Sequence, residues 1–109
     1  MAYNENLAKR IQVLLSSTPE LVEKKMFGGI AFLLRGNMAC GVHKDTLMVR
    51  LSPEQHTETL RIPYTTPFNL TGREMKGWVL VEEGGYQGEA ELEAWVRKGV
   101  DYALTLPPK

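Results

Sequence analysis

The chain has 109 residues, the size of one domain with one ordinary hydrophobic core. Hydrophobic residues make up 43% and charged residues 24%, a balance that argues against intrinsic disorder. Basic and acidic residues number 13 each, and this zero net charge argues against a general nucleic-acid or membrane-surface binder. One cysteine excludes an internal disulfide framework. With no signal peptide and no apolar run of membrane-spanning length, we expect a cytoplasmic protein.

The first predicted element is a helix over residues 5–16. Asn4 is a suitable N-cap, because its side-chain carbonyl can accept a hydrogen bond from a free amide of the first turn. Thr18-Pro19 ends the segment, since the residue before a proline avoids the helical region. Apolar residues recur at helical spacing and predict one buried stripe: Leu7, Ile11, Leu14 and Leu15.

Four strands are predicted next, over residues 20–27, 30–35, 38–43 and 46–51. The first is mixed and charged, which is typical of an edge strand. Turn residues separate the strands and predict an antiparallel meander: Gly28-Gly29, Gly36-Asn37 and Lys44-Asp45.

A capping-box pattern predicts a second helix over residues 53–61. Ser52 stands at the N-cap, Pro53 at the first helical position and Gln55 at the third. Residues 62–74 contain two prolines and a glycine and are predicted to be irregular. A fifth strand is predicted over residues 77–82.

The last predicted helix covers residues 89–105. Its predicted buried face contains Leu92, Trp95, Val96, Gly99, Ala103 and Leu106. A glycine inside a helix costs about 1 kcal/mol in helix propensity. We therefore expect Gly99 to allow a close approach of the helix to the sheet.

The resulting order, αββββαβα, predicts an α+β domain with two layers: a five-stranded antiparallel sheet and helices packed on it. Strand alternation assigns one face to Ile30, Phe32, Leu34, Met38, Cys40 and Val42. The opposite face receives Ala31, Leu33, Ala39, Met48, Val79 and Val81. A two-layer monomer should be polar on its second face, so we expect a second copy of the chain to bury part of it, as in a homodimer.

No constellation of residues predicts catalysis, a metal or a cofactor. Cys40 and His43 lie an odd number of positions apart on one strand, so their side chains should point to opposite faces. The residues around Cys40 favour a buried, inert thiol, and His56 is expected to be solvated. Neither glycine cluster, at residues 72–77 or 84–88, has the pattern of a phosphate-binding loop. The adjacent Glu82-Glu83 pair points apart and predicts no acid–base dyad.

Several segments resemble one protein family, in order and over nearly the whole chain. They are the segments at residues 26–32 (MFGGIAF), 36–42 (GNMACGV), 47–50 (LMVR), 75–79 (MKGWV), and 92–96 (LEAWV) continuing to 107. Together they resemble the N-terminal domain of the TfoX/Sxy family.

The resemblance implies a bacterial α+β domain similar to small dimeric chaperone-like folds. It also implies a link to transcription, because the namesake regulates natural competence as a coactivator with a transcription factor of the cyclic-AMP receptor type. That namesake carries a C-terminal domain of helix-hairpin-helix character. We expect this chain to be a single domain over residues 1–109 without it. The family brings no catalytic residues to carry over.

We interpret the chain as a non-enzymatic protein-interaction module, a homodimer with a protein partner such as a transcription factor. The residues expected at the interaction surface are Met26, Phe27, Gly28, Gly29, Leu33, Met48, Arg73, Lys76 and Trp78. We also expect Trp78 to contribute to the core. One alternative is an enzyme or small-ligand binder with a site near residues 26–29 and 73–78. Another is a DNA-associated protein, although direct binding of nucleic acid is not expected from the charge.

Overall fold

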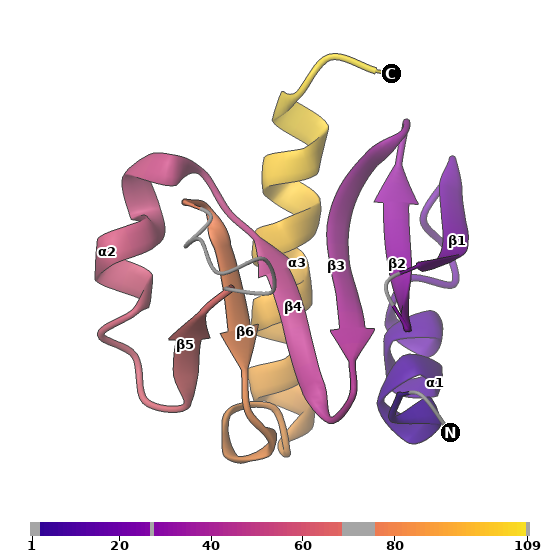
Figure 1. The fold of residues 1–109 in the computed structure, drawn as a ribbon. Helices are drawn as coiled ribbons and strands as arrows, with labels where there is room; N and C mark the ends of the chain where they lie inside the picture. Colours follow the sequence, from indigo (N-terminus) through magenta and orange to yellow (C-terminus); the bar gives the residue numbers. More distant parts are fainter. Residues whose placement is uncertain (1–2, 27, 69–75, 109) are drawn as a thin grey trace.

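The computed structural model describes residues 3–26, 28–68 and 76–108. Their strands form one antiparallel sheet in the order β1-β2-β3-β4-β6-β5. Helices α1 and α3 both lie behind this sheet in Figure 1, whereas the short α2 lies beside its β5 edge. The predicted α+β class with an antiparallel sheet and packed helices is confirmed. The predicted number of five strands is wrong, because the sheet has six.

The strands are β1 (Leu21–Met26), β2 (Gly29–Leu34), β3 (Asn37–His43), β4 (Thr46–Arg50), β5 (Thr65–Pro67) and β6 (Trp78–Val81). The α-helices are α1 (Glu5–Leu14), α2 (His56–Thr59) and α3 (Glu89–Thr105), with single 3-10 turns at Pro53–Gln55 and Glu83–Gly85. Two strands, β5 and β6, therefore lie between α2 and α3, where the sequence predicted only one. This changes the predicted order of elements as well as the number of strands.

The additional strand is β5, which lies inside the stretch predicted to be irregular. Its three residues pair with β6 at the end of the sheet. Pro67 has no amide hydrogen to donate. An edge strand tolerates a proline, because it has a neighbouring strand on one side only and needs fewer amide donors. Tyr64 enters the strand with a positive φ of 69°. Three residues are too few for a visible alternation, and this explains why the sequence pattern missed the strand.

Helix α1 begins as predicted. The Asn4 side-chain oxygen accepts a hydrogen bond from the Leu7 amide at 3.0 Å. Leu7, Ile11 and Leu15 are buried against the sheet, while Leu14 is partly buried at the end of the helix. The local cap and the apolar spacing together position this helix on one face of the sheet.

The β2–β3 turn is shifted by one residue from its predicted place. Arg35 and Gly36 hold the two positive φ values, 54° and 85°. Asn37 instead starts β3 and is buried, and its side-chain amide donates to the Pro107 carbonyl at 2.9 Å. The prediction of Gly36-Asn37 as the turn pair is wrong, since a distant contact with the end of the chain holds Asn37 in the strand.

The segment after β4 also differs from its prediction. Ser52 makes no side-chain capping bond. Its backbone carbonyl accepts from the Gln55 amide at 3.0 Å instead, which is the tighter 3-10 pattern. The predicted helix thus consists of a 3-10 turn followed by α2, and the capping box is wrong.

His56 is buried rather than solvated, which corrects a second prediction for this segment. Its Nδ1 accepts a hydrogen bond from the Gly77 amide at 3.1 Å. Gly77 has a φ of 86°, and this backbone conformation brings the turn before β6 onto His56. No pattern in the sequence links these two residues, because the contact is between distant segments.

Helix α3 has the predicted bounds, and it packs closely on the sheet at Gly99. A β-carbon at Gly99 would collide with the backbone carbonyl oxygen of Ala39 in β3. The predicted close approach of helix and sheet is therefore confirmed. Five of the six residues on the predicted face are buried, and Leu106 is partly exposed: Leu92, Trp95, Val96, Gly99 and Ala103 are the buried ones.

A β-bulge between β2 and β3 decides which side chains face the helices. Phe32 pairs with Cys40, but the next pair is Leu33 with Met38, so Ala39 is an extra residue in β3. Ala39 consequently packs towards α3, and Met38 points to the opposite face. The predicted assignment of Met38 and Ala39 to faces is wrong, because strict alternation assumes a strand without a bulge.

The main core lies between the sheet and helices α1 and α3. The strand residues in it include Ile30, Phe32, Cys40, Val42, Leu47, Val49, Leu51, Val79 and Val81. The assignment of Val79 and Val81 to the second face is also wrong. Val79 pairs with Val49, and Val81 pairs with Leu47. Paired residues lie on the same face of the sheet, so both valines face the helices.

Candidate interaction surface

The sheet carries a second apolar cluster on the face opposite the helices. We call this the outer sheet face; it is turned towards the viewer in Figure 1. Strands β2, β3, β4 and β6 contribute to it, together with the residue that follows β5. Its apolar members are Ala31, Leu33, Met38, Met48, Phe68, Trp78 and Leu80. The second apolar face expected from the sequence is thus present, with partly different members.

The centre and the margin of the outer sheet face differ in exposure. Ala31 and Met48 at its centre are fully buried within the single chain. Leu33, Trp78 and Leu80 are only partly buried. At the β1 side, Val22 pairs with Leu33 and is 59% exposed. The surface open to solvent is therefore the margin of the face, whereas the chain itself closes most of the centre.

Trp78 anchors one end of the outer sheet face. Its ring lies 5.9 Å from the Phe68 ring, at an interplanar angle of 56°. The Arg50 guanidinium carbon lies 5.1 Å from the Trp78 ring and 5.7 Å from the Tyr102 ring of α3. Arg50 thus connects the outer sheet face to the end of α3 through two cation–π contacts. Trp78 packs against this second cluster and not in the main core, because its neighbour Val79 takes the position that faces the helices.

Three of the residues expected at the interaction surface come together in this cluster: Leu33, Met48 and Trp78. Lys76 is exposed in the turn before β6. Gly28 and Gly29 lie elsewhere, at the β1–β2 turn, and Met26 is the β1 residue paired with Gly29. Phe27 and Arg73 lie outside the described residues.

The strand registers separate the two segments of the alternative small-ligand site. Ile30 pairs with Val42, and this row of the sheet continues through Leu47 to Val81. Gly29 precedes Ile30 and lies at the same end of the strands as this row, whereas Trp78 pairs with Arg50 at the other end. The β1–β2 turn and the start of β6 consequently lie at opposite ends of the sheet, with β3 and β4 between them.

Sequence reasoning missed four participants in the outer sheet face: Met38, Arg50, Phe68 and Leu80. Leu80 could have been found from Trp78, because residues two positions apart in a strand lie on the same face of the sheet. Met38 depends on the bulge and Phe68 on the unpredicted β5. No local pattern indicated either feature.

Cys40 and His43 do not form a nucleophile and base. Cys40 is buried in the helix-covered core, and burial raises the pKa of its thiol to about 12. His43 ends β3 on the other phase of the strand, and its pKa is lowered by partial burial and by the nearby Lys44 charge. A thiol with so high a pKa is almost entirely protonated at neutral pH and is a poor nucleophile.

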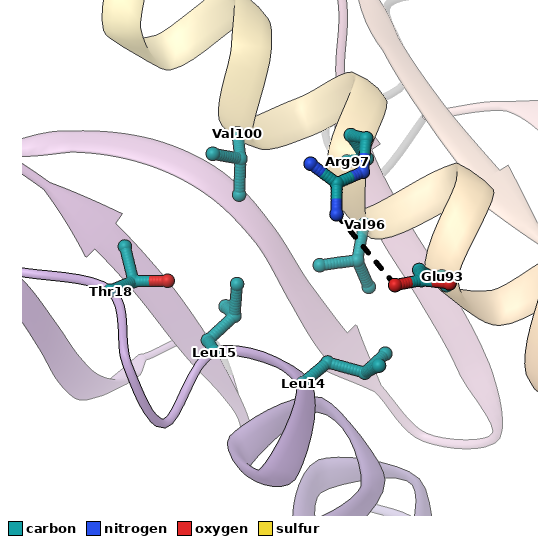
Figure 2. Close-up of a pocket in the computed structure, with 7 residues that line it drawn as sticks. All are labelled: Leu14, Leu15, Thr18, Glu93, Val96, Arg97 and Val100. Carbon is teal, nitrogen blue, oxygen red and sulfur yellow. Dashed lines mark ion pairs between the residues drawn. The ribbon is translucent and has the colours of Figure 1, made fainter.

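The hollows lined by described residues include three that have no member of the outer sheet face in their lining. The smallest, of about 90 Å³, separates the end of α1 from α3. Figure 2 shows Leu14, Leu15, Val96 and Val100 around it, and the ion pair between Arg97 and Glu93, with 3.6 Å between nitrogen and oxygen, at its rim. An open hollow of about 400 Å³ is lined by Asp45, Thr46, Tyr64, Glu82, Glu83 and Gly84. Another, of about 370 Å³, is lined by Ser52, Glu54, Gln55, Lys98, Asp101, Tyr102 and Thr105.

No three His, Cys, Asp or Glu side chains among residues 3–26, 28–68 and 76–108 gather in a way that could hold a metal ion. Within the same ranges, no helix is both long and apolar enough to cross a lipid bilayer.

A comparison with protein families decides the relationship of this chain. The model of the TfoX N-terminal domain matches residues 13–103. The chain belongs to the TfoX N-terminal domain family. In this TfoX N-terminal domain, the matched segment includes all six strands, most of α3 and the described outer sheet face. A search of curated proteins found no match to the chain.

Proposed function

We propose that this TfoX N-terminal domain is a non-enzymatic protein-interaction module, and that the margin of the outer sheet face is a docking surface. The observation that carries the proposal is the apolar strip across β1 and β2, where the exposed Val22 lies opposite the partly buried Leu33. Exposed apolar residues that adjoin one another favour contact with another protein.

The composition of the outer sheet face supports the same proposal. Aromatic residues and arginine are enriched in protein interfaces, and the partly exposed margin of this face contains Trp78 and Arg50. The half-buried Trp78, held by Phe68 and Arg50, offers a rigid anchor to a partner.

The finer role that we propose is regulation of transcription through a protein partner, in the manner of a coactivator. Membership of the TfoX N-terminal domain family supports this role, together with a formal net charge of zero that favours protein partners over nucleic acid. A partner protein would bring the DNA contacts in such a complex.

The test compares the wild-type protein with Leu80→Lys, a change on the outer sheet face, and with Leu104→Lys as a matched control. Leu104 is 48% exposed on α3, away from the sheet face. Partners captured from bacterial lysate are identified by mass spectrometry, and the affinity of the purified partner is then measured for each variant. We expect Leu80→Lys to weaken binding by about tenfold or more, because a charge would be desolvated at the contact, and Leu104→Lys to leave it unchanged.

Retention of no specific partner, or equal binding by Leu80→Lys and the wild type, would contradict the proposal. Circular dichroism and thermal unfolding of both variants confirm that each is folded before binding is compared. A thermal-shift screen against metabolites covers the small-ligand alternative, since a bound ligand raises the unfolding temperature.

A further inference from the structure

Strand β1 leaves a long open edge on the sheet. All six of its residues pair with β2, and within the described part of the chain it has no second strand partner. The opposite edge is β5, which has only three residues and includes Pro67. Figure 1 shows β1 at the outer limit of the sheet. About half of the amide and carbonyl groups of such an edge point away from the sheet and can pair with another strand.

We propose that β1 pairs antiparallel with β1 of a second copy of this chain, so that the two sheets join into one. The inference rests on the proposed role in protein contacts, but it uses the sheet edge rather than the outer sheet face. Edge pairing is a common mode of recognition, in which main-chain hydrogen bonds bind and side chains set the register.

Geometry limits the registers that such a pair can adopt. A two-fold axis between adjacent antiparallel strands is perpendicular to the sheet, so the helices of both copies lie on the same side. Opposed residues must therefore belong to the same face of the sheet. Glu23 and Lys25 pair with Phe32 and Ile30 on the helix side, while Lys24 pairs with Ala31 on the outer side. The axis therefore lies where one β1 residue faces the same residue of the other copy, and not midway between two consecutive residues of β1.

Charge selects one register from this small set. With the axis at Lys24, Glu23 of each copy opposes Lys25 of the other, and the apolar Val22 opposes Met26. Two opposite-charge pairs then form on the helix side. Only Lys24 opposes its own copy, and its long exposed side chain can turn away into solvent.

The neighbouring registers are poorer. An axis at Glu23 opposes the two glutamates to each other and places Leu21 opposite Lys25. An axis at Val22 places Leu21 opposite Glu23, and an axis at Lys25 opposes the two Lys25 residues. Each of these registers loses the two complementary pairs.

The side chains that would form the pairs are accessible. Glu23, Lys24 and Lys25 are all exposed. Glu23 already accepts a hydrogen bond from the Gln12 side chain of α1 at 2.7 Å, which restricts its position at the edge. Charged residues on an edge strand oppose indiscriminate pairing. Here the same charges are complementary in a single self-pairing register.

The first experiment measures the dimer dissociation constant by sedimentation equilibrium, at low ionic strength, for the wild type and four variants. Glu23→Lys and Lys25→Glu each replace two attractive pairs with two repulsive ones, so we expect about tenfold weaker dimerisation. The double variant E23K/K25E restores opposite charges and should recover most of the affinity. Arg61→Glu makes the same charge change as Lys25→Glu at an exposed position in the turn after α2 and should have no effect.

The second experiment tests the position of the axis. Lys24→Cys places two thiols opposite each other, and we expect an intermolecular disulfide on mild oxidation, whereas Arg61→Cys should give none. The native Cys40 is buried and does not interfere. Circular dichroism shows whether each variant is folded. If loss of the hydrogen bond from Gln12 destabilises Glu23→Lys, Lys25→Glu still tests the charge pairs, because it leaves that hydrogen bond in place.

A wild-type protein that stays monomeric up to about millimolar concentration, well above the dissociation constants of specific dimers, would overturn the inference. Failure of E23K/K25E to recover the affinity lost in the single variants would overturn the register. Neither result would affect binding of a different protein partner that is sensitive to Leu80→Lys, so the two proposals fail separately.

Discussion

The chain has two tryptophans, and they lie on opposite sides of the same sheet. Trp95 belongs to the helix-covered core, is 6% exposed, and donates its indole hydrogen to the Gly85 carbonyl at 3.2 Å. Trp78 lies on the outer sheet face and is only partly buried, with Phe68 and Arg50 as ring neighbours. Trp95 is carried by a long helix that packs it against the sheet, whereas Trp78 lies in a short strand whose outer face no described helix covers.

The comparison indicates how the two faces divide their roles. A long amphipathic helix such as α3 excludes water from the sheet over many residues, and the burial of its apolar face stabilises the fold. The outer sheet face is closed only at its centre, so its margin keeps apolar surface that can contact another molecule. Substitutions on the two faces test this division.

The largest effect is expected for Trp95→Ala. Removal of a buried indole leaves a cavity and breaks the hydrogen bond to the Gly85 carbonyl, and should lower the free energy of unfolding by about 3–5 kcal/mol. Urea unfolding followed by circular dichroism measures the change. A loss below about 1 kcal/mol would mean that α3 does not seal the core at this position.

An intermediate effect is expected for Gly99→Ala. Alanine favours the helix by about 1 kcal/mol. Its β-carbon would, however, collide with the Ala39 carbonyl oxygen, and overpacking of this kind costs about 1–3 kcal/mol. The obstacle is a backbone atom that cannot easily move aside, so the cost lies at the upper end of this range, and we expect a net loss of about 2 kcal/mol or more in urea unfolding. Ala94→Gly, at an exposed position of the same helix, is the control for propensity alone; a more stable Gly99→Ala variant would contradict the close approach.

The smallest effect on stability is expected for Trp78→Ala. The ring is only partly buried, so its removal should cost about 1–2 kcal/mol, clearly less than the loss at Trp95. The same urea experiment on both variants gives the comparison directly. Equal losses for the two tryptophans would show that the outer sheet face stabilises the fold as much as the helix-covered face does.

Local signals in the sequence predicted much of the architecture. The apolar spacing and the acidic first turn of α3 determine a helix with the predicted bounds, because these interactions join residues within one or two turns. The Asn4 cap of α1 is equally local. The outer sheet face was predicted through Leu33 and Met48, since alternation along a regular strand fixes the face of each side chain.

The remaining features depend on contacts between distant segments. His56 is buried because Gly77 donates to it across the fold, and Asn37 is held by Pro107. Met38 reaches the outer sheet face through a bulge, which depends on how β3 pairs with β2. Phe68 joins the same face because β5 pairs with β6. None of these pairings has a counterpart in the periodicity of a single segment.

The sequence by itself determined the class of the fold, the long helix, the order of the first four strands and a surplus of apolar strand residues. Short-range spacing encodes these features, because side-chain direction repeats every two residues in a strand and about every 3.6 in a helix. Only the tertiary structure decided that α1 and α3 share one face, that the opposite face is closed at its centre, and that β1 pairs with one strand alone among the described residues. Strand pairing and burial join residues far apart in the chain, and local patterns do not specify such pairs.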